Sequence, residues 1–434
     1  MSGLELLRHD VAYLHWTEKM EVVNLAAMLL FIPVNSGISL VFACVWMFNV
    51  ILKNTMLKRW SFFGWHQDKN YHYSKSYCFL IPMMCYWGAY LISMLWTENQ
   101  PAGRLELGQL IWFLVLPLTC VCTDFRQFSE RIVRMMLWIY VLTLSVLFVL
   151  NLAIQFVHAC GAPEYSFFEY LATHEFYYMH HSYMALYLVA GMAFLYSEWA
   201  RKEKHGKREL LVMIVCLCCL LLFLFFINSR TGSLCLILLL GLCLTHLFFV
   251  QKRYRTALVS LVVIIALVTG VHYALPDNFR RLSNTAGQVA QGDDSDIRFT
   301  IMNNAWTIVK DNVVLGVGAG DRMDVLTPFY ITEENPHDTI YNPHNQYLDT
   351  WMATGVTGLL ALLVMLLLPW VMAWKKRYVF PFLLLVMLMV SLLFESMLER
   401  QMGIVFTGVM YIYILLFFQL DSFGIITTKF PQHE

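Results

Sequence analysis

Charged residues are scarce in this sequence. Asp, Glu, Lys and Arg make up 14% of its 434 residues, whereas hydrophobic residues make up 59%. Soluble domains typically carry about 25% charged residues. The composition therefore excludes a water-soluble globule of this size and indicates an all-α polytopic membrane protein.

Other features are also missing. The eleven cysteines lie mostly inside apolar runs without a paired spacing in a loop, so we expect no disulfide framework and no metal site. The net charge is +0 and no basic stripe carries interleaved aromatic residues, so we expect no nucleic-acid partner. The first twenty residues are polar and of mixed charge, and we expect no cleavable signal peptide.

What the sequence does have is a series of apolar runs close to the ~18 residues that span hydrocarbon. The stretch Pro33–Gly37 marks either a tight turn between two short spans or a kink in one long span. We count twelve candidate spans, at residues 21–34, 37–52, 77–96, 105–122, 133–157, 182–199, 210–227, 233–250, 256–275, 347–373, 379–396 and 402–419.

The basic residues indicate how these spans are oriented, because cytoplasmic loops retain Lys and Arg. Most of the 30 basic residues fall in alternate loops, which places both termini in the cytoplasm. The long polar segment 276–346 then lies outside. We expect one integrated membrane domain, with nine spans in 1–275, this loop with short helices, and three spans and a cytoplasmic tail in 347–434.

The polar candidates for chemistry gather on the outer side. Arg230 lies in Asn228-Ser-Arg-Thr-Gly232, between two apolar runs. An Arg at membrane depth costs at least ~2.5–3.5 kcal/mol on insertion scales and is usually functional or paired. The alternative is a helix-end Arg whose side chain reaches the interface.

Arg298 follows Asp296, a plausible N-cap, and we expect it in the first turn of a helix that continues through Trp306. A cation there opposes the helix dipole and suits an anionic ligand better than it suits stability. A solvated loop Arg is the alternative. The glycines of Leu315-Gly-Val-Gly-Ala-Gly320 predict a tight loop and no nucleotide site, because no strand precedes them.

His344 is the strongest candidate for a catalytic residue. It precedes Asn345, which can cap a helix beginning near Gln346, so His344 is predicted to lie at a helix start on the outer surface. An imidazole with an ordinary pKa near ~6.5 suits a general base. An interfacial polar residue is the alternative, and we count Asn345 as a substrate-binding residue beside His344.

Further polar residues form candidate walls of a site. His181, with His174 and His180, lines either an acceptor groove or an interfacial aromatic belt. Glu395, Glu399 and Arg400 follow the eleventh apolar run, where they form either an internal ion-pair network or part of the site.

Several of these motifs, in this order, resemble the O-antigen ligase and O-antigen polymerase superfamily of bacterial envelope glycosyltransferases. The motifs cover about residues 225–402. They are Ser229-Arg-Thr-Gly232, Arg298 ahead of Ala305-Trp306, Leu315-Gly-Val-Gly318, Pro343-His-Asn-Gln-Tyr347, Gly355-Val-Thr-Gly358 and Glu395-Ser-Met-Leu-Glu-Arg-Gln401.

The resemblance implies a GT-C-like enzyme with about twelve transmembrane helices in the bacterial inner membrane. Its donor would be an undecaprenyl-diphosphate-linked glycan, and a ligase would transfer that glycan to lipid A–core on the periplasmic face. Arg230 and Arg298 match the family's diphosphate-binding arginines and His344 its catalytic histidine, with no metal or cofactor. A polymerase of the same superfamily is the main alternative, and a polytopic transporter is a further one.

Overall fold

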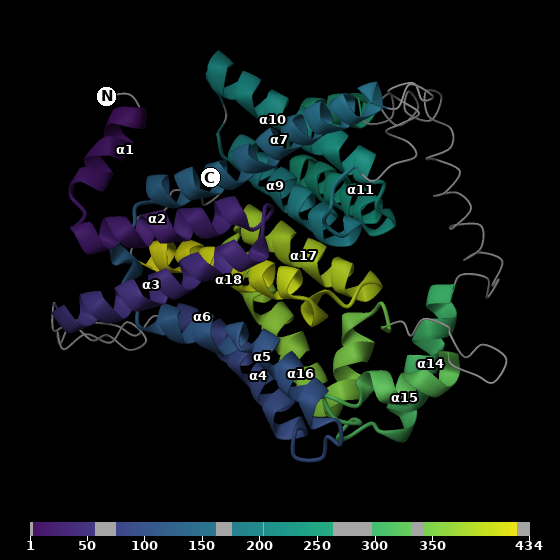
Figure 1. Ribbon diagram of the computed structural model, residues 1–434. Helices are drawn as coiled ribbons and strands as arrows, with labels where there is room; N and C mark the ends of the chain where they lie inside the picture. Colours follow the sequence, from purple (N-terminus) through teal and green to yellow (C-terminus); the bar gives the residue numbers. More distant parts are fainter. Residues whose placement is uncertain are drawn as a thin grey trace.

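The computed structural model describes residues 3–56, 75–161, 176–202, 204–263, 297–330 and 342–422. These residues form helices and no strand, which confirms the predicted all-α class (Figure 1). In chain order the helices are α1 (Gly3–Ala12), α2 (Trp16–Phe31), α3 (Ser36–Met56), η1 (Lys75–Leu80), α4 (Ile81–Ser93), α5 (Gln100–Leu110), α6 (Trp112–Val121), η2 (Phe125–Gln127), α7 (Glu130–Cys160), α9 (His181–Arg201), α10 (Lys207–Ile227), α11 (Arg230–Thr245), η3 (His246–Val250), α14 (Ile297–Asp311), α15 (Arg322–Tyr330), α16 (Gln346–Lys376), α17 (Val379–Phe394), η4 (Met397–Glu399) and α18 (Gln401–Ser422).

Helices occur at all twelve predicted apolar runs, although only the first part of the run 256–275 is described. Seven helices among the described residues are long and apolar enough to cross a membrane. Three shorter apolar helices cover Tyr77–Ser93, Tyr254–Val263 and Val379–Phe394. A polytopic membrane protein is therefore supported, while the number of twelve spans and the GT-C-like architecture stay predictions.

The first predicted pair of spans consists of two helices. Asn35 separates α2 from α3, and its side-chain oxygen accepts hydrogen bonds from the backbone N–H groups of Gly37 (2.8 Å) and Ile38 (3.3 Å). An Asn in this position satisfies donors that a new helix would leave open. The tight turn, and not the kink, is the correct interpretation of Pro33–Gly37.

Helix α18 lies at the centre of the bundle (Figure 1). It is apolar on all sides, and its apolar stretch is fully buried among the other helices. Its tyrosines find partners for their hydroxyls in the core, because Tyr411 donates to the carbonyl of Met365 (2.7 Å) and Tyr413 to that of Leu25 (3.0 Å). These bonds remove the cost of burying the two hydroxyls.

The helix ends fall into two groups, as the predicted loops require. One end of the bundle holds the ends of α10 and α17 and the starts of α9, α11, α16 and α18, and we call it the site face. The other end holds ion pairs between basic and acidic side chains, such as Lys53–Glu21 (2.7 Å) and Lys202–Glu209 (2.6 Å). The segments predicted to be outside thus share one face, and its periplasmic location remains a prediction.

The long polar segment carries the predicted short helices. Helices α14 and α15 lie beyond one end of the bundle, alongside α16 (Figure 1). Their apolar faces meet α16 in a small core made of Ile301, Ile308, Val309, Leu326 and Met352. This packing joins α14, whose second residue is Arg298, to the part of α16 that contains Met352.

The glycine-rich loop between α14 and α15 docks onto a break in α16. Gly316 and Gly318 have positive φ angles of 69° and 112°, as a tight loop needs, and Gly355 inside α16 has φ 66° and ψ −160°. The break frees carbonyls of α16, which accept from Val317 (2.8 Å, to Met352) and Gly318 (3.1 Å, to Ala353). The loop therefore replaces hydrogen bonds that α16 loses.

We predict that Gly355→Ala lowers the thermal unfolding temperature of the purified protein. The φ angle of Gly355 is 66°, and an added Cβ would collide with the carbonyl of Val314. Such backbone strain costs about 1–3 kcal/mol before the collision is counted. The control is Gly241→Ala in α11, where an added Cβ meets nothing within 4 Å. Equal melting temperatures for the two variants would contradict this account of the break.

Candidate active site

Arg230 occupies a sharp turn between α10 and α11. Asn228 ends α10 in the left-handed conformation (φ 54°), which Asn tolerates better than most residues. The hydroxyl of Ser229 then caps α11 by accepting from the N–H of Gly232 (3.1 Å). Arg230 follows as the first residue of α11 with an exposed side chain. Its charge is unfavourable at a helix N-terminus, so this position favours an anion.

The same turn packs against the start of α9 and is hydrogen-bonded to it. Gly232 lets α11 approach α9, since an added Cβ would stand 2.6 Å from that of Ala185. His181 places Nδ1 2.7 Å from the carbonyl of Ile227. A carbonyl only accepts, so this nitrogen carries the hydrogen and Nε2 of His181 remains an acceptor.

His344 lies where the sequence predicts, directly before the N-cap of α16. Asn345 is that N-cap, and its side-chain oxygen accepts from the N–H groups of Tyr347 (3.0 Å) and Leu348 (3.1 Å). The positive φ of His344 (47°) was not predicted. A non-glycine residue in this region is strained, and such strain often accompanies functional sites.

The imidazole of His344 is held by the carboxylate of Glu395. Nδ1 lies 3.0 Å from Oε1 of Glu395, while Oε2 accepts from the hydroxyl of Ser182 (3.1 Å). Because an ionised carboxylate only accepts, Nδ1 of His344 donates and its Nε2 keeps the lone pair. The His344 side chain is 19% exposed, against 5% for Glu395. The arrangement is that of a base oriented by a buried acid.

The charge of Glu395 depends on this contact. Burial acts to raise the pKa of Glu395, but the hydrogen bond and charge of His344, with help from His180 and Ser182, hold it below its usual value of 4.5. Burial, reinforced by Arg400 and the neighbouring histidines, lowers the pKa of His180, although Glu395 opposes the shift. Glu395 is thus ionised near neutral pH, and the nearest side chain to its Oε1 is the imidazole of His344, 3.0 Å away.

Three other groups of predicted site residues have no described side-chain contact. Arg298 is the second residue of α14, in the first turn as predicted, but its side chain lies outside the described residues. His174 and Asp296 also lie outside them. Arg400 follows η4 with an exposed side chain, for which the described residues supply no hydrogen bond or ion pair.

A buried charged cluster beside His344 contains Glu399, for which an ion-pair network was one of the two predictions. The sequence reasoning missed its other members, Arg322, Asp349 and Glu106. The guanidinium of Arg322 donates to Asp349 in α16 and to Glu106 in α5 (2.8 Å), and lies 3.8 Å from Glu399. Burial works against the charge of Arg322, yet these carboxylates raise its pKa well above the usual value. The available signal was that Glu106 and Asp349 lie near the starts of the predicted apolar runs 105–122 and 347–373, where ionisable residues are costly.

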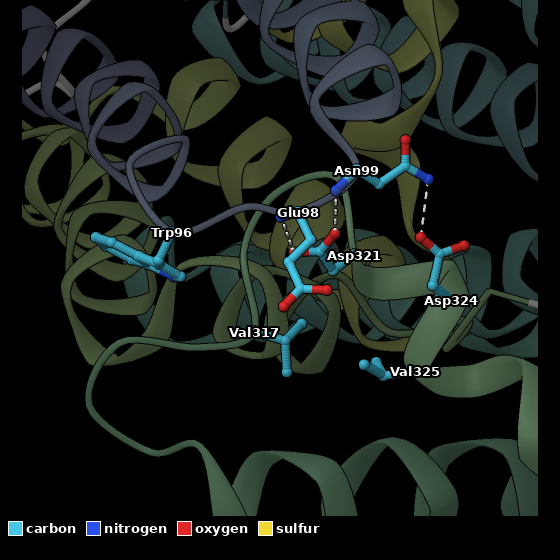
Figure 2. A pocket seen from close by; sticks show the side chains of 7 residues that line it. All are labelled: Trp96, Glu98, Asn99, Val317, Asp321, Asp324 and Val325. Carbon is cyan, nitrogen blue, oxygen red and sulfur yellow. Dashed lines mark hydrogen bonds between the residues drawn. The ribbon is translucent and has the colours of Figure 1, made fainter.

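A pocket of about 500 Å³ lies between the segment before α5 and the residues around the start of α15. Figure 2 shows Asp321, next to Arg322 in the chain, accepting from the backbone N–H groups of Glu98 (2.9 Å) and Asn99 (2.7 Å). Asn99 in turn donates to Asp324 (2.8 Å). These bonds tie the start of α5 to α15. Within the described ranges, no three His, Cys, Asp or Glu side chains are grouped as a metal site.

The site thus belongs to a helical membrane protein in which a carboxylate orients a histidine, and Arg230 begins a helix on the same face. Residues 213–363 match the sequence family described as O-antigen ligase. This match confirms the predicted resemblance to the O-antigen ligase and polymerase superfamily. It includes Arg230, Arg298 and His344 but ends before Glu395. No curated protein matches the chain.

The lowered pKa of Glu395 predicts an acid-dependent part of the stability. A carboxyl whose pKa is lower in the folded than in the unfolded state stabilises the fold above its unfolded pKa, and this contribution is lost as the pH falls through the folded pKa. The unfolded value is near 4.5. Acidification from pH 6 to pH 3 should therefore lower the melting temperature of the wild type more than that of Glu395→Gln. An equal fall in melting temperature for the wild type and Glu395→Gln would contradict the stabilising role of the Glu395 carboxylate.

Proposed function

We propose that this protein is a ligase-type glycosyltransferase that moves a glycan from undecaprenyl diphosphate to lipid A–core at the periplasmic face. The proposal is supported chiefly by one observation, the contact of His344 with Glu395 on the face where Arg230 begins α11. The family match over residues 213–363 supports the class of donor.

His344 acts as the general base. With its Nδ1 hydrogen directed to Glu395, the lone pair on Nε2 accepts the proton of the acceptor hydroxyl as that oxygen attacks the anomeric carbon. Glu395 stabilises the imidazolium that forms. Attack from the face opposite the departing diphosphate inverts the anomeric centre.

Arg230 and Arg298 bind the diphosphate. Breaking the bond between the anomeric carbon and the phosphate oxygen leaves negative charge on the diphosphate, and a planar guanidinium meets phosphate oxygens with two parallel hydrogen bonds. The helix starts of α11 and α14 add backbone N–H groups of the right polarity. Two arginines supply the positive charge that a metal would otherwise provide.

The acceptor lies on the α9 side of His344. His181 keeps Nε2 as an acceptor for a sugar hydroxyl, and Arg400 offers an exposed cation for the phosphates of a lipid A–core. Asn345 fixes the start of α16 by accepting a hydrogen bond from the N–H of Tyr347. Membrane lipids surround the apolar helices.

Purified protein should form product from undecaprenyl-diphosphate glycan and lipid A–core in the presence of EDTA. His344→Ala should lower the rate by about 10²–10⁴-fold, the usual contribution of a general base. Arg230→Ala should weaken donor binding. The control is Arg131→Ala, an exposed arginine paired with Asp10 at the opposite end of the bundle. Turnover by His344→Ala at the wild-type rate would refute the assigned base.

The acceptor class has its own test. Deletion of the gene should leave unattached glycan polymer on its lipid carrier if the protein is a ligase. Core capped by a single repeat unit would instead show a polymerase, which uses the same donor with a second lipid-linked repeat as acceptor. Flipping of lipid-linked glycan by reconstituted protein, unaffected by Arg230→Ala and Arg298→Ala, would show a transporter.

A further inference from the structure

We propose that Arg322 is a positioning residue that sets the reactive geometry of His344 through the segment 395–400. The inference rests on the proposed function, because it assigns Arg322 a part in the reaction of His344. Its basis is the set of contacts that joins the buried guanidinium to both anchors of the histidine.

The guanidinium of Arg322 bridges four parts of the fold. Its side chain is 6% exposed. Nη1 donates to Asp349 in the first turn of α16, Nη2 donates to Glu106 in α5, and Nε donates to the carbonyl of Ala319 (3.4 Å) in the glycine-rich loop. Nη2 also lies 3.8 Å from Glu399, which brings in the segment 395–400.

The segment 395–400 in turn supplies both anchors of His344. The ring is held by Glu395 at its start (3.0 Å). The backbone N–H donates to Asn342 (3.2 Å), whose amide group donates to Glu399 near the end of the same segment. A shift of 395–400 would therefore move the imidazole and its backbone support together.

His344 needs such support because of its backbone conformation. A φ of 47° in a non-glycine residue persists only where the surroundings hold it. Gln346 adds a further tie, since its side-chain oxygen accepts from the N–H of Leu398 (2.6 Å). Arg322 is the cation that contacts Asp349, Glu106 and Glu399, so it joins three carboxyl groups from separate segments.

Lysine cannot replace arginine here. A planar guanidinium directs five N–H groups toward several acceptors at once, whereas an ammonium is a single point charge. Arg322→Lys keeps the positive charge and loses the set of hydrogen bonds that joins the segments around Arg322. We expect kcat to fall about 10- to 100-fold with little change in the donor KM, because a displacement near 1 Å at the reacting group costs up to about 10²-fold.

The decisive experiment is a double-mutant cycle between Arg322→Lys and Glu399→Gln. Glu399 is the partly exposed member of the cluster, with 22% of its side chain accessible, so Glu399→Gln folds even if Arg322→Lys is unstable. If Arg322 acts through Glu399, each single variant lowers kcat, and the double variant is barely slower than the slower single one. Additive losses, or wild-type kcat in both singles, would overturn the proposal.

A second readout does not depend on transferase activity. Modification of His344 by diethyl pyrocarbonate, followed by peptide mass spectrometry, reports how firmly its ring is held. Both variants should react faster than the wild type, because the anchors loosen. Inactive wild-type protein with this difference would refute the proposed function alone, whereas active wild type with equal reaction rates would refute the positioning role alone.

The matched control is Arg134→Lys. Arg134 makes a bidentate bond to the buried Glu198 at the opposite end of the bundle, so it shares the chemistry of Arg322 and not its location. This variant should lower the melting temperature and leave kcat and the His344 reaction rate unchanged. A fall in kcat equal to that of Arg322→Lys would assign the effect to general loss of stability.

Discussion

The bond between His344 and Glu395 is the interaction on which the site depends. It joins the start of α16 to the end of α17, and it determines which imidazole nitrogen carries the hydrogen. Without it the ring could rotate or change tautomer, and Nε2 would lose its defined direction. Glu395 is more deeply buried than His344, so the histidine is the member of the pair that a substrate can reach.

The rest of the site face holds this bond in place. Ser182 binds the second oxygen of Glu395, and His181, one residue earlier, fixes the turn that ends in Arg230. The start of α9 therefore links the base to a helix-end cation. Close packing of the helices supports such links, because a densely packed interior has low compressibility.

Sequence reasoning predicted the features that depend on neighbours in the chain. Asn345 was identified as an N-cap because its side chain reaches N–H groups two and three residues later. The glycine loop was predicted from residues that tolerate positive φ. Arg322 was not found, because its partner Glu106 is 216 positions away in the sequence. The loop's docking onto the break at Gly355 likewise depends on packing between distant segments.

The most direct test of the central claim is a cryo-electron microscopy structure of the protein with undecaprenyl diphosphate bound. The account predicts a diphosphate within hydrogen-bonding distance of the Arg230 guanidinium, in a cavity that Nε2 of His344 also faces. A diphosphate bound at the opposite end of the bundle, or on the site face in a cavity closed to His344, would contradict it.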